Sequence, residues 1–206
     1  MHEQAFLLAS DVHGFFQELI SQTLEGRRDR PIPVVESYLV GLLEDSAQGK
    51  SSDAMSSVLR GPLSVQLSQA LHAPAHERFE RLVRLGDGIL LLGGLFEPHV
   101  QASGMDERYV SLLGARAYSA AAGLMSVDSL PGAEQPLDVL GRLAAEFGRL
   151  MALLRDVADT LLARSAKTAN DWSRLLEKWL SRRSEHLERL LIAQGITLQQ
   201  RGGLLV

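Results

Sequence analysis

Cysteine is absent from the 206-residue sequence, and this absence excludes several kinds of chemistry at once. Disulfide bonds, thiolate zinc sites, iron–sulfur clusters and cysteine nucleophiles all require a thiol group. The fold must therefore be held together by packing and hydrogen bonding, and any catalysis must use other side chains.

Long apolar runs are missing as well. The longest, Ile89–Phe96, is far shorter than the roughly 20 apolar residues that cross a bilayer. The N-terminal sequence MHEQAFLLASDVHG has acidic and histidine residues where a secretion signal has lysine or arginine, so no such signal is visible. We therefore expect a cytoplasmic protein with no membrane partner.

Aromatic residues make up only 5% of the sequence, and few segments alternate apolar and polar residues as strands do. Leucine, alanine and valine recur at helical spacing instead, which predicts an all-α fold. The length suits a single domain. A net charge of −4 provides no general attraction for nucleic acid, so we expect no nucleic-acid partner.

The stretch Arg78–Gly104 is apolar on every side of a helix, which is typical of a helix buried in a domain core. Its interior contains four glycines, Gly86, Gly88, Gly93 and Gly94. Each costs roughly 0.5–1 kcal/mol relative to alanine in a helix, so close packing of a neighbour has to compensate. Proline removes a backbone donor, which predicts a kink near Gly93–Pro98.

We expect six to eight helices in one bundle over residues 1–194, followed by a tail over 195–206. The predicted helix over 106–125 is rich in small residues and should pack on the glycine face of the central helix. The C-terminal helix, 164–194, and the helix before it form either a hairpin about 166–170 or one continuous rod. Periodicity does not distinguish these two arrangements.

Asp87 lies between two glycines, where its carboxylate would be partly buried and would need a partner. Arg84, Arg116 or a helix N-terminus qualifies as that partner. We therefore predict a ligand-binding pocket beside the central helix. Its residues are Asp87, His99, Tyr109, Arg116 and Tyr118.

The segment from Arg164 to Arg189 has seven lysines and arginines against four acidic residues, a local charge of +3. Trp172 and Trp179 lie seven residues apart on one helix face. They are either core residues or anchors of an interface, where tryptophan is enriched. We predict a homodimer or partner interface, while a solvated helix face also explains the charge. The predicted interface residues are Trp172, Trp179, Arg182 and Arg183.

Motifs for phosphate, metal and catalysis are incomplete. The phrase GKSS at Gly49–Ser52 resembles the end of a phosphate-binding loop, but Glu44 replaces the earlier glycine and a helix precedes it. His72 and His76 have the spacing of a helical metal pair, although Pro74 lies between them. There is no GxSxG or HExxH motif and no catalytic triad, so we predict no metal, cofactor or catalytic residue.

The phrase LGDGILLLGG at 85–94, together with His13 near the N-terminus, is similar to haem oxygenases, with a different glycine spacing. This resemblance implies that His13 is an axial haem ligand and that Asp87 organises distal water. Packing alone also explains a glycine-rich helix.

Three phrases are similar to a family of uncharacterised bacterial helical proteins. They are YLVGLL at 38–43, LGDGILLLGGLF at 85–96 and RYVSLLGARAYSAAAGL at 108–124. The resemblance implies a bacterial origin, and it transfers no activity. The residues to which it gives a structural role are Gly86, Asp87, Tyr109, Gly114 and Tyr118.

These observations favour a cytoplasmic bacterial protein-interaction or regulatory module, homodimeric through its C-terminal helices. The alternative is a helical ligand-binding protein or enzyme. Its haem-like or metal site would then lie in a pocket beside the kinked central helix.

Overall fold

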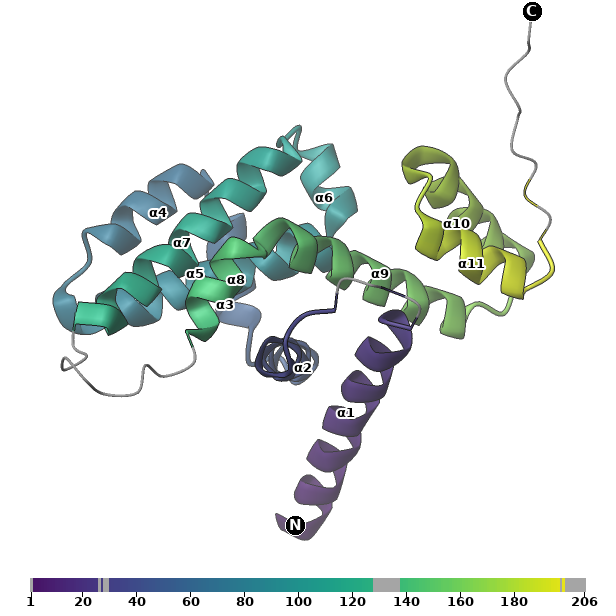
Figure 1. Cartoon of the computed structure of the whole chain (residues 1–206), viewed down its shortest axis with the longest axis horizontal. Helices are drawn as coiled ribbons and strands as arrows, with labels where there is room; N and C mark the ends of the chain where they lie inside the picture. Colours follow the sequence, from purple (N-terminus) through teal and green to yellow (C-terminus); the bar gives the residue numbers. More distant parts are fainter. Residues whose placement is uncertain (1, 26, 28–29, 128–137, 197, 199–206) are drawn as a thin grey trace, which may run out of the picture. The chain divides into compact units, whose positions relative to one another are not determined.

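The computed structural model describes residues 2–25, 27, 30–127, 138–196 and 198. These residues form eleven α-helices and no strand (Figure 1), which confirms the all-α class. The helices are α1 (His2–Thr23), α2 (Pro33–Ala47), α3 (Ser52–Leu59), α4 (Leu63–Leu71), α5 (Ala75–Leu95), α6 (Glu97–Ala102), α7 (Glu107–Val127), α8 (Val139–Ala145), α9 (Phe147–Ser165), α10 (Ala169–Arg182) and α11 (Glu185–Ala193). No helix in this part of the chain is both long and apolar enough to span a membrane.

The chain divides into two compact units, Met1–Arg155 and Asp156–Val206, which we call the N-terminal unit and the C-terminal unit. This division differs from the single bundle over 1–194 that the sequence predicts. Its physical basis is a separate core in the C-terminal unit. That core consists of Leu175, Trp179, Leu187 and Leu191, with Ile196 and Leu198 at the start of the predicted tail packed against it.

Helix α5 is the buried centre of the N-terminal unit. It packs against α3, α4 and α6, and most extensively against α7. Leu82, Leu85 and every residue of the run Ile89–Leu92 are at most 4% exposed. Burying one such side chain contributes about 1.5–3 kcal/mol, so this helix supplies much of the apolar stabilisation of the unit.

The glycines of α5 lie where neighbouring helices approach it most closely. A Cβ atom on Gly86 would lie 2.6 Å from Cε1 of Tyr118 in α7. Gly88 meets α3 in the same way, and Gly93 and Gly94 meet α9. The predicted packing of α7 on a glycine of the central helix is therefore confirmed at Gly86, whereas the other three glycines meet α3 and α9.

The central stretch contains two helices. Helix α5 ends at Leu95, because Phe96 leaves helical geometry with φ −113° and ψ 35°. Helix α6 then begins at Glu97, with Pro98 in its first turn, where proline is tolerated. The position at which the sequence predicts a kink is thus a helix boundary in the structure.

Helices α9 and α10 form a hairpin and not one continuous rod. Helix α9 ends at Ser165 and α10 begins at Ala169. Lys178 and Arg182 of α10 donate hydrogen bonds to Asp159 of α9 at 2.7 and 2.6 Å. The chain therefore reverses direction between the two helices.

The single helix predicted over 164–194 is interrupted once more. Its first part, α10, begins with a capping box in which the side chains of Thr168 and Asp171 each accept a backbone N–H of the other. Hydrogen bonds from Thr168, together with the backbone N–H of Lys167, lower the pKa of Asp171. Helix α10 ends because Arg183 adopts the left-handed conformation, with φ 52°.

Gly114 and Gly123 of α7 provide a matched test of glycine packing. A Cβ atom on Gly114 would collide with the buried ring of Phe147, whereas nothing lies within 4 Å of one on Gly123. We expect Gly123→Ala to raise the free energy of unfolding by about 0.5–1 kcal/mol through helix propensity. Gly114→Ala should lower it by about 1–3 kcal/mol, because overpacking outweighs that gain. Urea unfolding measures both changes, and equal effects at the two sites would contradict the packing argument.

Candidate functional site

Asp87 of α5 accepts two short hydrogen bonds inside the N-terminal unit. The hydroxyls of Tyr38 in α2 and Tyr118 in α7 each donate to its Oδ1 atom at 2.6 Å. The partners of the Asp87 carboxylate are thus two tyrosines, whereas the sequence predicts Arg84, Arg116 or a helix N-terminus. One carboxylate oxygen joins three helices that are distant in sequence.

The position of the Tyr118 ring makes this arrangement possible. The ring is fully buried and lies against Gly86. A side chain in place of this glycine would displace the ring. The rings of Tyr38 and Phe147 pack beside it, with centroids 6.3 and 5.7 Å away. Such aromatic pairs contribute about 0.5–1.5 kcal/mol beyond their burial, so they hold the hydroxyls in place.

Burial shifts the proton equilibria of all three groups. It raises the pKa of Asp87 above the ordinary value, and the hydrogen bonds from Tyr118 and Tyr38 oppose this change. Burial also raises the pKa of Tyr38 and of Tyr118, and the charge of Asp87 raises both further. The two phenols therefore keep their protons at neutral pH and act as donors. The cluster is a tie between helices, since Tyr118 is too deeply buried to meet a solute.

A cleft of about 370 Å³ lies at the C-terminal end of α5. Most of its apolar lining comes from α3 and the end of α5, and its polar lining comes from α2, the turn after α2 and α6. The lining residues are Ser46, Gly49, Ser51, Met55, Leu59, Leu92, Phe96 and His99. We call this feature the apolar cleft.

The boundary between α5 and α6 shapes the apolar cleft. Because the backbone leaves helical geometry at Phe96, this large apolar side chain is 46% exposed, whereas Leu92, one turn earlier, is buried. His99 follows in α6 and is exposed. The end of the central helix thus supplies a buried residue, Leu92, and a half-exposed one, Phe96, to the lining of the cleft.

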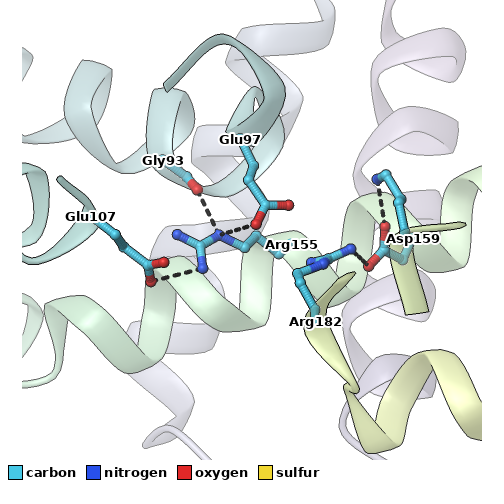
Figure 2. Close-up of polar contacts among 7 residues, drawn as sticks. Gly93, Glu97, Glu107, Arg155, Asp159 and Arg182 are labelled. Atoms are coloured by element: carbon cyan, nitrogen blue, oxygen red, sulfur yellow. Dashed lines mark hydrogen bonds and ion pairs between the residues drawn. The ribbon is translucent and has the colours of Figure 1, made fainter. Parts of the chain in front are cut away.

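Arg155 of α9 holds this boundary in place. Its Nε donates to the carbonyl oxygen of Gly93 at 2.9 Å, and its Nη1 donates to Glu107 at 2.8 Å. Glu97 lies 4.0 Å from Nε, and Figure 2 shows the guanidinium among these three groups. Carbonyl groups in the last turn of a helix lack partners within that helix. Arg155 therefore caps α5 and ties its end to the beginnings of α6 and α7.

A second buried carboxylate lies in the C-terminal unit. Asp159 is fully buried and accepts hydrogen bonds from Lys178 and Arg182 (Figure 2). Removing one partner from such a buried pair typically costs about 3–5 kcal/mol. We therefore interpret this cluster as the polar part of the packing between α9 and α10.

The four residues predicted for an interface all take part in the packing of the C-terminal unit. Trp179 is buried in its core, and Trp172 packs against that core. Arg182 pairs with Asp159, and the guanidinium carbon of Arg183 lies 4.5 Å from the ring centroid of Trp179. A role for them in an interface stays a prediction.

Only two of the five residues predicted for a pocket contact each other through a hydrogen bond in the described part of the chain. Asp87 and Tyr118 are hydrogen-bonded. His99 instead lines the apolar cleft. Tyr109 and Arg116 are exposed on α7, and within the described residues no hydrogen bond or ion pair links either one to Asp87.

Sequence reasoning missed Tyr38 as a partner of Asp87. The two lie 49 residues apart, so no local pattern relates them. The composition held one indication of this partner. A buried carboxylate needs hydrogen-bond donors, and the chain has only three tyrosines that could supply a phenol hydroxyl. The apolar lining of the cleft was also missed, because Phe96 belongs to the apolar run that predicts a buried central helix and no local pattern relates it to Met55 and Leu59.

The described part of the chain contains no group of three or more histidine, aspartate or glutamate residues that could hold a metal ion. His72 follows α4 whereas His76 belongs to α5, with Pro74 between the two helices. The imidazole of His13, an axial ligand in the haem hypothesis, lies 3.0 Å from Oε2 of Glu44.

Comparison with known proteins finds no matching family, no similar curated protein and no similar solved structure. The resemblance to uncharacterised bacterial proteins, and the bacterial origin that it implies, therefore stay predictions. The function has to be inferred from the geometry of the chain itself.

Substitution of Asp87 tests the state of its carboxyl group. Asp87→Asn keeps the oxygen that accepts both tyrosine hydroxyls and removes the charge. A carboxyl group whose pKa is raised by folding contributes stability below its unfolded pKa, near 4, and loses it as the pH rises through the folded pKa. We expect the free energy of unfolding of the wild type, relative to the variant, to fall as the pH rises from about 4 to 8. Urea unfolding across this range measures the difference.

Asp171 provides a control of opposite sign. Its pKa is lowered by folding, so its contribution is present above the unfolded pKa and lost as the pH falls through the folded one. The wild type, relative to Asp171→Asn, should therefore lose stability on acidification. A difference for Asp87→Asn that does not vary with pH, or varies as it does for Asp171→Asn, would show that burial does not control the Asp87 carboxyl.

Proposed function

We propose that this protein is a binding protein whose N-terminal unit takes a small, largely apolar molecule in the apolar cleft. The single observation that carries the proposal is the cleft itself. Its volume of about 370 Å³ falls within the range of roughly 300–1,000 Å³ that is typical of small-molecule sites.

The lining chemistry supports this function. Ligand sites are mainly apolar with a few polar groups that orient the ligand. Here thioether, aliphatic and aromatic groups come from Met55, Leu59 and Phe96. Hydroxyl and imidazole groups come from two serines and a histidine of the same lining. Single exposed apolar residues are common on protein surfaces, but Leu59 and Phe96 are both exposed and line one cleft.

The way the cleft is built also supports a preformed site. Its floor belongs to α5, which the tyrosine pair at Asp87 and the guanidinium of Arg155 hold at two points. A ligand that enters a rigid cleft loses less affinity to reorganisation of the protein. We therefore expect binding without a large structural change.

Leu59 and Val65 give a matched pair for testing the cleft. They are similarly exposed, at 51% and 49%, but only Leu59 lines the cleft. We expect Leu59→Trp to fill the cleft and to weaken binding of the neutral fluorophore N-phenyl-1-naphthylamine by about tenfold or more, which is about 1.4 kcal/mol. Val65→Trp should leave the affinity unchanged. Fluorescence titration measures both, and saturable binding that is equal in the two variants, or absent from the wild type, would refute this function.

Self-association through the C-terminal unit is a second candidate function. Each of its three helical segments carries one large apolar side chain that is exposed, namely Leu161, Leu180 and Ile192. Such residues are available to a second copy of the chain, whereas the tryptophans are already packed. This observation supports a homodimer and is independent of the cleft.

Leu180 and Leu112 provide the test of self-association. They are 51% and 58% exposed and lie in different units. If the C-terminal unit forms a dimer interface, Leu180→Arg should weaken dimerisation at least about tenfold, because a charge would be buried without a partner. Leu112→Arg should have no effect. Sedimentation equilibrium measures the dissociation constants, and a monomeric wild type would exclude the dimer.

A further inference from the structure

The polar and apolar groups of the apolar cleft come from different segments. Met55 and Leu59 belong to α3, and Leu92 lies in the last turns of α5. The hydroxyls come from α2 and the turn after it, and the imidazole of His99 comes from α6. A molecule that satisfies both sets must itself be amphipathic, with an apolar body and one polar end.

The polar lining favours a hydrogen-bond acceptor at that end. Serine hydroxyls and an imidazole N–H donate hydrogen bonds, and the described lining of the cleft includes no carboxylate. A cationic head group would require such an acceptor, whereas a carboxylate accepts two or more hydrogen bonds at once. Charge-assisted hydrogen bonds to a carboxylate are also stronger than those to a neutral group.

Two acidic residues that are close in sequence to the polar lining have cationic partners. Asp45 lies 3.4 Å from Nζ of Lys50, and Glu97 lies 4.0 Å from Nε of Arg155. Each of these two charges is therefore partly balanced by its partner. In the described residues no side chain forms a hydrogen bond or an ion pair with the imidazole of His99, which leaves it available to a ligand.

We propose that the ligand of the apolar cleft is a short amphiphilic monocarboxylate. Its hydrocarbon part lies against Leu59, Leu92 and Phe96, and its carboxylate accepts hydrogen bonds from His99 and Ser51. This proposal rests on the proposed binding function and adds the chemical class of the ligand. The cleft volume lies near the lower end of the usual range, which suits a short chain.

Three probes with the same tail and different heads test the proposal: octanoate, 1-octanol and octylamine. Each is titrated against the full-length protein with bound N-phenyl-1-naphthylamine. We expect octanoate to bind about tenfold more tightly than 1-octanol, because its hydrogen bonds are charge-assisted, and octylamine to bind most weakly.

His99 variants assign the head-group contact. His99→Leu should abolish the preference for octanoate over 1-octanol while leaving the affinity for 1-octanol nearly unchanged. His99→Gln retains an N–H donor and should restore part of the preference. His76→Leu, at an exposed histidine outside the cleft, is the control and should behave as the wild type does.

The outcomes separate this proposal from the proposed function. Equal affinity for octanoate and 1-octanol, both reduced by Leu59→Trp, would overturn the carboxylate proposal and leave the binding function intact. A preference for octanoate that persists in His99→Leu would overturn the assigned contact. Failure of all three probes and of the fluorophore to bind would overturn both proposals.

Discussion

The close contact between α5 and its neighbours is the constraint on which the N-terminal unit depends. Gly86 admits the ring of Tyr118, and Gly93 and Gly94 admit side chains of α9. Each glycine costs a helix up to about 1 kcal/mol relative to alanine, so α5 is a poor helix by propensity. The apolar run Ile89–Leu92 offsets this cost only when other helices cover it. Helix formation and tertiary packing are therefore inseparable in α5.

The same close contact explains how a carboxylate lies in the middle of this helix. Burying Asp87 is unfavourable unless hydrogen-bond donors compensate, and Tyr118 reaches it because its ring rests on a glycine. Tyr38 completes the arrangement from α2. Asp159 in the C-terminal unit meets the same requirement with two cations. In both units a buried carboxylate ties helices together, but only the first is tied by neutral donors.

The apolar cleft forms where the close contacts of α5 end. Beyond Leu95 the backbone leaves helical geometry, and Arg155 supplies the hydrogen bond that a continuing helix would have supplied to Gly93. The consequence is an apolar side chain, Phe96, that its neighbours leave 46% exposed. The cleft therefore lies where one helix ends and its neighbours no longer cover its last apolar side chains.

The sequence by itself determined the all-α class and the packing of α7 against α5 at Gly86. These features follow from helical periodicity and side-chain size, which are local properties of the chain. Only the tertiary structure decided the boundaries at Phe96 and Arg183, because a cap from α9 and a left-handed arginine leave no local pattern. It alone also decided the partners of Asp87, which lie 31 and 49 residues away. In the sequence Leu59 and Leu92 look alike, yet one is exposed and the other buried, because burial depends on which neighbours cover a residue.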